Sequence, residues 1–196
     1  MRRWDMRDVS GATPLDADEA HALLPTHIAT QGELNAWEQR NIAAAARWAM
    51  SRRRRRTEHV LSVRFAQQLH RRMFDATWQW AGTYRVTDKS LGIPASQVRV
   101  ALRDRLADVL LWHAERIFDR DELAARLHFV LVSVHPWPNG NGRWARLMAD
   151  AYLHVERQPL FTWGSAEAST ARNRYVSALK AADAGEFTEL LRFVRT

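Results

Sequence analysis

The sequence contains no cysteine, which excludes disulfide bonds, thiolate metal sites and cysteine nucleophiles. It also lacks any apolar run near the roughly 20 residues that a membrane-spanning helix needs. Its first twenty residues lack the apolar stretch of a signal peptide. Lysine is scarce, since it occurs only at Lys89 and Lys180. From these absences we expect a cytoplasmic protein that does not enter a membrane.

The 196 residues are 46% hydrophobic and 26% charged, a composition typical of one folded domain. The 29 basic and 22 acidic residues give a net charge of +7. Such an excess is common in nucleic-acid-binding proteins, but only Arg52–Arg56 form a basic run, and acidic residues lie among the others. The excess therefore indicates a solvated surface, and direct nucleic-acid binding is not expected.

Apolar residues recur at helical spacing over most of the chain. The spacing predicts helices over residues 32–50, 60–76, 97–118, 121–134, 142–156 and 166–194. Between Thr77 and Ser96, two glycines and a proline interrupt the pattern, which predicts a short β-hairpin flap or an extended one. The expected fold is all-α, a single helical domain over residues 1–196 with one small β-hairpin. Residues 1–57 would form an N-terminal helical extension of a core over residues 58–196.

Residues 135–146, HPWPNGNGRWAR, hold the densest set of chemically active residues. A strongly apolar helix is expected to stop at His135, because a proline follows it. The glycines beyond it allow close backbone approach, and the start of the next helix favours a bound phosphate. Arg143 and Arg146, three residues apart, can reach the same anion. His135 beside that anion is a natural general base, because a free imidazole has a pKa of about 6.5. The simpler alternative, a helix cap and a tight turn, explains fewer of these residues.

This segment resembles the signature of Fic-domain proteins, His-x-Phe-x-Asp/Glu-Gly-Asn-Gly-Arg-x-x-Arg. The matching positions are His135, Gly140, Asn141, Gly142, Arg143 and Arg146. Trp80-Ala81-Gly82 with Arg85 is similar to the family's Trp-Ala-Gly stretch, so the resemblance covers roughly residues 78–159. The phrases TPLDADEA, LLPTHI and GELNAWEQ are most similar to a subgroup called mobile mystery protein B, whose members accompany mobile elements.

The resemblance implies a protein adenylyltransferase that moves AMP from ATP to a Ser, Thr or Tyr hydroxyl of a target protein. His135 would take the hydroxyl proton. The phosphates would lie against the backbone amides of Gly140, Asn141 and Gly142. The side chains of Arg143 and Arg146 would neutralise their charge. Residues 88–99 would form a flap that aligns the target by strand addition, chiefly through Ser90, Leu91, Gly92 and Ile93. The family's cofactor is Mg²⁺ or Mn²⁺, and a toxin-like member would have an antitoxin-like or DNA-binding partner.

Two positions depart from the family pattern. Trp137 replaces a phenylalanine and keeps an aromatic side chain. Asn139 replaces the carboxylate that binds Mg²⁺, and an amide oxygen brings no charge, so we expect weak metal binding at Asn139. This leaves a second interpretation open, a catalytically weakened nucleotide-binding regulatory module paired with a DNA-binding partner.

The family's inhibitory pattern, Ser/Thr-x-x-x-Glu, is absent from the sequence. Glu38, on a predicted helix before the core, is the candidate for an inhibitory glutamate, and we expect it to pair with Arg146. The alternative is that Glu38 faces solvent on an amphipathic helix.

Overall fold

The computed structural model describes residues 22–25, 31–51, 56–165 and 171–196. The phrase TPLDADEA, half of LLPTHI, most of the run Arg52–Arg56 and the first five residues of the last predicted helix lie outside this range. Within the described part, every regular element is a helix, so the all-α fold class is confirmed. No helix in that part is both long enough and apolar enough to cross a membrane.

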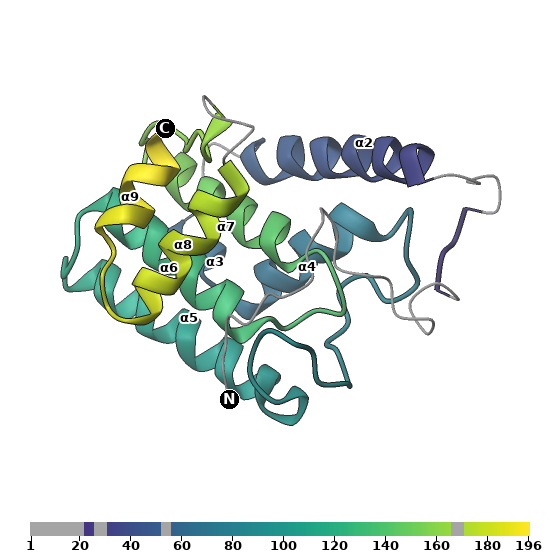
Figure 1. Ribbon diagram of the computed structural model, residues 1–196, viewed down its shortest axis with the longest axis horizontal. Coiled ribbons are helices and arrows are strands. Elements are labelled where there is room, and N and C mark those ends of the chain that lie inside the picture. Colours follow the sequence, from purple (N-terminus) through teal and green to yellow (C-terminus); the bar gives the residue numbers. More distant parts are fainter. Residues whose placement is uncertain (1–21, 26–30, 52–55, 166–170) are drawn as a thin grey trace.

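The described part of the chain contains eight α-helices and one short 3-10 helix, η1; Figure 1 shows how the α-helices are arranged. Their bounds are α2 (Gln31–Met50), α3 (Thr57–Val60), α4 (Val63–Phe74), η1 (Ala95–Gln97), α5 (Val98–Ala114), α6 (Arg120–Val134), α7 (Asn141–Val155), α8 (Ala171–Asp183) and α9 (Thr188–Arg195).

Helix α7 lies at the centre of the fold, in contact with α2, α3, α4 and α6 (Figure 1). Its largest side chains, Trp144 and Tyr152, are fully buried. The Trp144 indole also donates a hydrogen bond to the carbonyl of Ala66 in α4 at 3.0 Å. Since α6 and α7 supply both ends of the loop 135–140, that loop is fixed between two buried elements.

Two predicted helices are each interrupted once. The helix expected over residues 60–76 breaks at Leu61 and Ser62, because the Ser62 hydroxyl caps α4 by accepting the Phe65 N–H at 3.2 Å. The last predicted helix divides into α8 and α9 at a turn containing Gly185, whose φ of 95° is easy for glycine alone.

The expected β-hairpin is wrong for residues 77–96. The one β-bridge there joins Trp78 to Leu23, and residues 83–94 are irregular. The buried guanidinium of Arg85 accounts for this, because it donates hydrogen bonds to the carbonyls of Thr87, at 2.9 Å, and Ile93. One side chain thus binds backbone groups from both arms of the loop, which a hairpin would have paired with each other.

Candidate functional site

The loop between α6 and α7 closes on itself through one asparagine side chain. His135 ends α6 in the left-handed conformation, with φ 52° and ψ 59°. Beyond it, the Asn141 amide accepts the Trp137 N–H at 2.9 Å and donates to the Trp137 carbonyl at 2.8 Å. Gly140 has a φ of 76°, and a Cβ there would collide with the Phe74 ring. These contacts set the loop backbone before any ligand binds.

His135 stands at the start of this loop, packed against Gly92. A Cβ on Gly92 would lie only 2.5 Å from the His135 Cβ, so only a glycine lets the two segments approach this closely. Burial, and next the positive charge of Arg85, lower the pKa of the His135 imidazole to about 4. The imidazole is therefore neutral at physiological pH, the form that a general base requires.

The loop backbone is also bound to α4 through His70. The two ring nitrogens of His70 contact the Asn139 carbonyl, at 3.1 Å, and the Gly82 N–H, at 3.0 Å. Burial lowers the pKa of His70 to about 3, so the ring is neutral, with Nε2 donating to Asn139 and Nδ1 accepting from Gly82. The ring also stacks on Trp137 at 4.6 Å. The sequence showed only a histidine in an apolar helix and gave no sign of this role.

One of the expected phosphate-binding amides is already occupied. The Gly140 N–H donates to the Asn139 side-chain oxygen at 2.6 Å. The helical geometry leaves the N–H groups of Asn141, Gly142 and Arg143 without a partner within α7. Next to them, a Cβ on Gly142 would meet nothing within 4 Å. The first turn of α7 therefore has open space for an anion.

The same contact weakens the expected metal site. Among the described residues, no group of three or more His, Cys, Asp or Glu could bind a metal ion. The side-chain oxygen of Asn139 is the loop's neutral candidate ligand, and it is engaged by Gly140. The loop 135–140 therefore offers Mg²⁺ no charged ligand.

Glu38 reaches the loop from α2, but its partner is not the expected one. One carboxylate oxygen is 2.7 Å from an Arg143 guanidinium nitrogen, and the other accepts the Trp78 indole N–H at 2.7 Å. Glu38 is buried, so the interpretation that it faces solvent is wrong. The expected pairing with Arg146 is also wrong, because α2 meets the first turn of α7, where Arg143 lies.

Arg146 lies against aromatic rings on α8 and in the turn before it. Its guanidinium carbon is 4.9 Å from the centre of the Tyr175 ring and 5.5 Å from that of Trp163. Asp150 accepts the Trp163 indole N–H at 3.1 Å. Arg143 instead lies over the Phe74 ring, at 5.1 Å. The two arginines thus have different surroundings, and the structure does not bring them to one shared contact.

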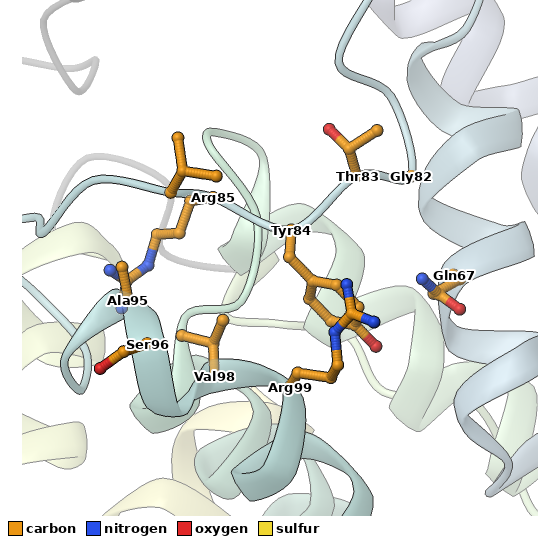
Figure 2. A pocket seen from close by; sticks show the side chains of 10 residues that line it. Gln67, Gly82, Thr83, Tyr84, Arg85, Ala95, Ser96, Val98 and Arg99 are labelled. Atoms are coloured by element: carbon orange, nitrogen blue, oxygen red, sulfur yellow. The ribbon is translucent and has the colours of Figure 1, made fainter.

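A cavity of about 600 Å³ opens beside the flap. Figure 2 shows its lining, which comes from Gln67 of α4, residues 82–86, and the segment of η1 and α5 that ends at Arg99. The target-binding residues expected from the sequence, Ser90 to Ile93, do not line it. Sequence reasoning missed this cavity, because its walls come from three separate segments.

Comparison with known proteins relates the chain to one family. Residues 60–153 match the model of the Fic/DOC family. The chain is 29% identical over 140 residues to protein adenylyltransferase fic-1 of Caenorhabditis briggsae, which covers 69% of this chain and 27% of that protein. The Caenorhabditis elegans protein of the same name is also 29% identical over 140 residues, with 68% and 26% covered. The chain thus spans about a quarter of the length of these curated relatives.

Solved structures show the same fold. Fic-1 residues 134–508 from C. elegans superimpose with a TM-score of 0.64 at 26% identity, covering 90% of this chain and 51% of that one. A Fic-domain signaling protein from Bacteroides thetaiotaomicron gives 0.66 at 18% identity, with 87% and 66% covered. BepC from Bartonella tribocorum, solved with bound AMPPNP, gives 0.64 at 15% identity, with 92% and 97% covered. At these lower identities the likeness extends to the fold alone.

Proposed function

We propose, for a chain whose residues 60–153 form a Fic/DOC family domain, that it transfers AMP from ATP to a Ser, Thr or Tyr hydroxyl of a target protein. The observation that carries the proposal is a neutral imidazole, that of His135, at the start of a short loop that leads directly into the open first turn of α7. That pairing puts a proton acceptor beside a site suited to phosphate. The activity in the names of the fic-1 relatives supports the same reaction.

In the proposed reaction, the target oxygen attacks the α-phosphorus of ATP. The hydroxyl proton passes to the His135 imidazole, a new oxygen–phosphorus bond forms, and the bond to the β-phosphate oxygen breaks, so that pyrophosphate leaves. The N–H groups of Asn141, Gly142 and Arg143 would face the phosphates, with Gly140 excluded unless Asn139 releases it. The Arg143 side chain would add positive charge once it is free of Glu38. The positive end of α7 favours the same charge distribution.

Mg²⁺ or Mn²⁺ would arrive with the nucleotide and neutralise phosphate charge. The loop 135–140 offers it no charged ligand. Phosphate oxygens and water would be its main ligands.

The experiment for this function is transfer of radiolabelled AMP from ATP to proteins of a cell lysate. The wild-type chain should label one or more proteins. His135→Ala should abolish labelling while it leaves ATP affinity within about twofold, because the imidazole meets the target hydroxyl. His154→Ala, at the far end of α7, is the matched control and should label normally. ATP binding below detection in the wild type would contradict the proposal.

The bond between Asn139 and Gly140 favours a second candidate function, a nucleotide-binding regulatory module with little transfer activity. The subgroup assignment, mobile mystery protein B, belongs to this second candidate, as does a DNA-binding or antitoxin-like partner. Both are supported by the sequence phrases alone. Asn139→Asp separates the two candidates. If the chain is an enzyme, the added charge should lower the Mg²⁺ concentration needed for transfer. A binding module should bind ATP in both forms and transfer AMP in neither.

A further inference from the structure

The cavity beside the flap has a positively charged lining. Arg85 and Arg99 contribute to its wall, and no acidic residue does. Arg85 is committed elsewhere, since its buried guanidinium donates hydrogen bonds to the carbonyls of Thr87 and Ile93 and, at 2.6 Å, to that of His135. Arg99 is exposed, and its guanidinium lies 5.1 Å from the centre of the Tyr84 ring. This cation–π contact places the Arg99 guanidinium at the cavity wall.

Tyr84 gives the cavity a rigid aromatic wall. Its ring stacks on Trp137 with the centroids 5.1 Å apart and the planes 16° from parallel. In Figure 2 the Arg99 guanidinium lies against the Tyr84 ring, with Gln67 facing them across the opening. Burial raises the pKa of the Tyr84 phenol, so its hydroxyl keeps its proton and can donate a hydrogen bond. An arginine and a phenol beside each other are suitable donors for a carboxylate.

The cavity wall is joined to the proposed active site through the backbone. The Arg85 N–H donates to the Pro136 carbonyl at 3.0 Å, one residue beyond His135. Residue 86 at the rim is a valine, with 90% of its surface exposed. The cavity wall is therefore hydrogen-bonded directly to the loop that begins at His135.

We propose that this cavity binds an acidic side chain of the target protein, a few residues from the modified hydroxyl, through the Arg99 guanidinium and the Tyr84 hydroxyl. This inference rests on the proposed function and adds a substrate preference to it. The Fic-type loop provides the phosphate-binding groups, whereas Arg99 and Tyr84 would determine the preference for an acidic target. Neither of them belongs to residues 135–146.

Selection from a displayed peptide library tests the preference without any need for transfer. Peptides with a central Ser, Thr or Tyr and random flanks are selected on the immobilised chain without nucleotide, then sequenced. The wild type should enrich Asp and Glu about tenfold at one fixed distance from the centre, as expected for a charge-assisted hydrogen bond. Arg99→Glu should lose that enrichment and favour Lys and Arg at the same distance.

Arg103→Glu is the matched control, because Arg103 lies one turn further along α5 with a side chain 67% exposed. It should keep the wild-type preference. Equal loss of acidic enrichment in both variants would indicate an effect of overall charge and overturn the proposal, as would a wild type that enriches no acidic residue. Since selection requires no ATP, acidic enrichment in a chain that labels no protein would overturn the transferase and leave the cavity as an acidic-peptide site.

Discussion

The pKa of the His135 imidazole, lowered to about 4 by burial and by Arg85, affects how transfer should respond to pH. A base acts while unprotonated, so the transfer rate should fall only as the pH approaches the pKa that His135 has in the folded protein. An exposed histidine would lose about 90% of its neutral form by pH 5.5, since its pKa is about 6.5. His135 should lose almost none. We therefore predict a transfer rate that stays within about twofold between pH 8 and pH 5.5.

The measurement is initial AMP transfer at saturating ATP, corrected for the folded fraction from circular dichroism at each pH. A decline with a midpoint near pH 6.5 would show that the imidazole is solvated during the reaction. Such a result would mean that residues 90–93 move away from His135 when the target binds.

Arg146 depends on residues that lie beyond the segment matched by the family model. Its guanidinium lies over the rings of Trp163 and Tyr175. A cation over an aromatic face is worth about 1 kcal/mol at a partly exposed site, or about fivefold in affinity. If Arg146 meets the ATP phosphates, Trp163→Leu should weaken ATP binding by about fivefold, whereas Trp163→Phe should bind nearly as well as the wild type.

Calorimetric titration with ATP is the measurement for both Trp163 variants. Both lose the hydrogen bond to Asp150, so a purely structural role would weaken them equally. Equal affinities in the two variants would therefore show that the aromatic face does not position Arg146.

At the scale of elements, helix α2 reaches the site through one carboxylate. The Glu38 contact at 2.7 Å occupies the Arg143 guanidinium that ATP would need. Glu38→Gln removes the charge but keeps an oxygen able to accept the Trp78 N–H. Because 44% of the Arg143 side chain is exposed, the ion pair is worth only about 1–1.5 kcal/mol. We predict roughly tenfold tighter ATP binding and a comparable rise in transfer.

Glu33→Gln, at an exposed position in the first turn of the same helix, removes the same charge and should change neither quantity. ATP titration and AMP labelling of both variants provide the comparison. A Glu38→Gln chain with wild-type affinity would mean that Glu38 serves to pack α2 against Trp78 and has no inhibitory role.

The helices themselves follow from local sequence, and the contacts between them do not. Apolar spacing gave six helical segments because each buries one face. The interruptions at Ser62 and Gly185 escaped it, since a cap or a turn changes only one or two residues within a periodic pattern. The hairpin prediction failed for a longer-range reason. Arg85 satisfies the backbone carbonyls that a strand partner would have bound.

The candidate site, too, was predictable where it depends on one segment and not where it depends on contacts between segments. The residue types and spacing of residues 135–146 indicated a phosphate site, because backbone and side-chain chemistry lie within one segment. The partner of Glu38 depends on where α2 crosses α7, which no spacing within either helix reveals. The occupied Gly140 N–H was equally hidden, because Asn139 can either accept that hydrogen bond or face a ligand.

At the scale of the whole molecule, the part of the chain that the structure describes keeps two fully buried histidines and the partly buried His135 without charge. Burial is the main cause in each case, and it lowers the pKa of His70 and His128 to about 3 and that of His135 to about 4. His128 is bonded through Nε2 to the Tyr175 hydroxyl at 3.0 Å. The pKa of Asp150 shifts in the opposite direction, since burial raises it to about 6.

These shifts fix the sign of the dependence of stability on pH. A histidine whose pKa is lower in the folded chain stabilises the fold fully above about pH 6.5, and that stability is lost as the pH falls toward 4, because the unfolded chain takes up protons first. At pH 5 each of these three histidines lowers the free energy of unfolding by about 2 kcal/mol relative to pH 7.5, so that together they lower it by about 6 kcal/mol. Asp150 opposes this by about 1.4 kcal/mol, because its raised pKa makes the folded chain bind the proton more tightly.

We therefore predict that the free energy of unfolding falls by about 5 kcal/mol between pH 7.5 and pH 5, a large share of the 5–15 kcal/mol typical of a whole domain. Urea titration followed by tryptophan fluorescence at the two pH values measures this difference. His128→Gln keeps a polar group for the Tyr175 hydroxyl but cannot titrate. Whatever its stability at pH 7.5, its loss on acidification should be smaller than that of the wild type by about 2 kcal/mol. A wild-type loss below about 1 kcal/mol would mean that the histidines gain charge without unfolding the chain, and hence that the interior around them admits water.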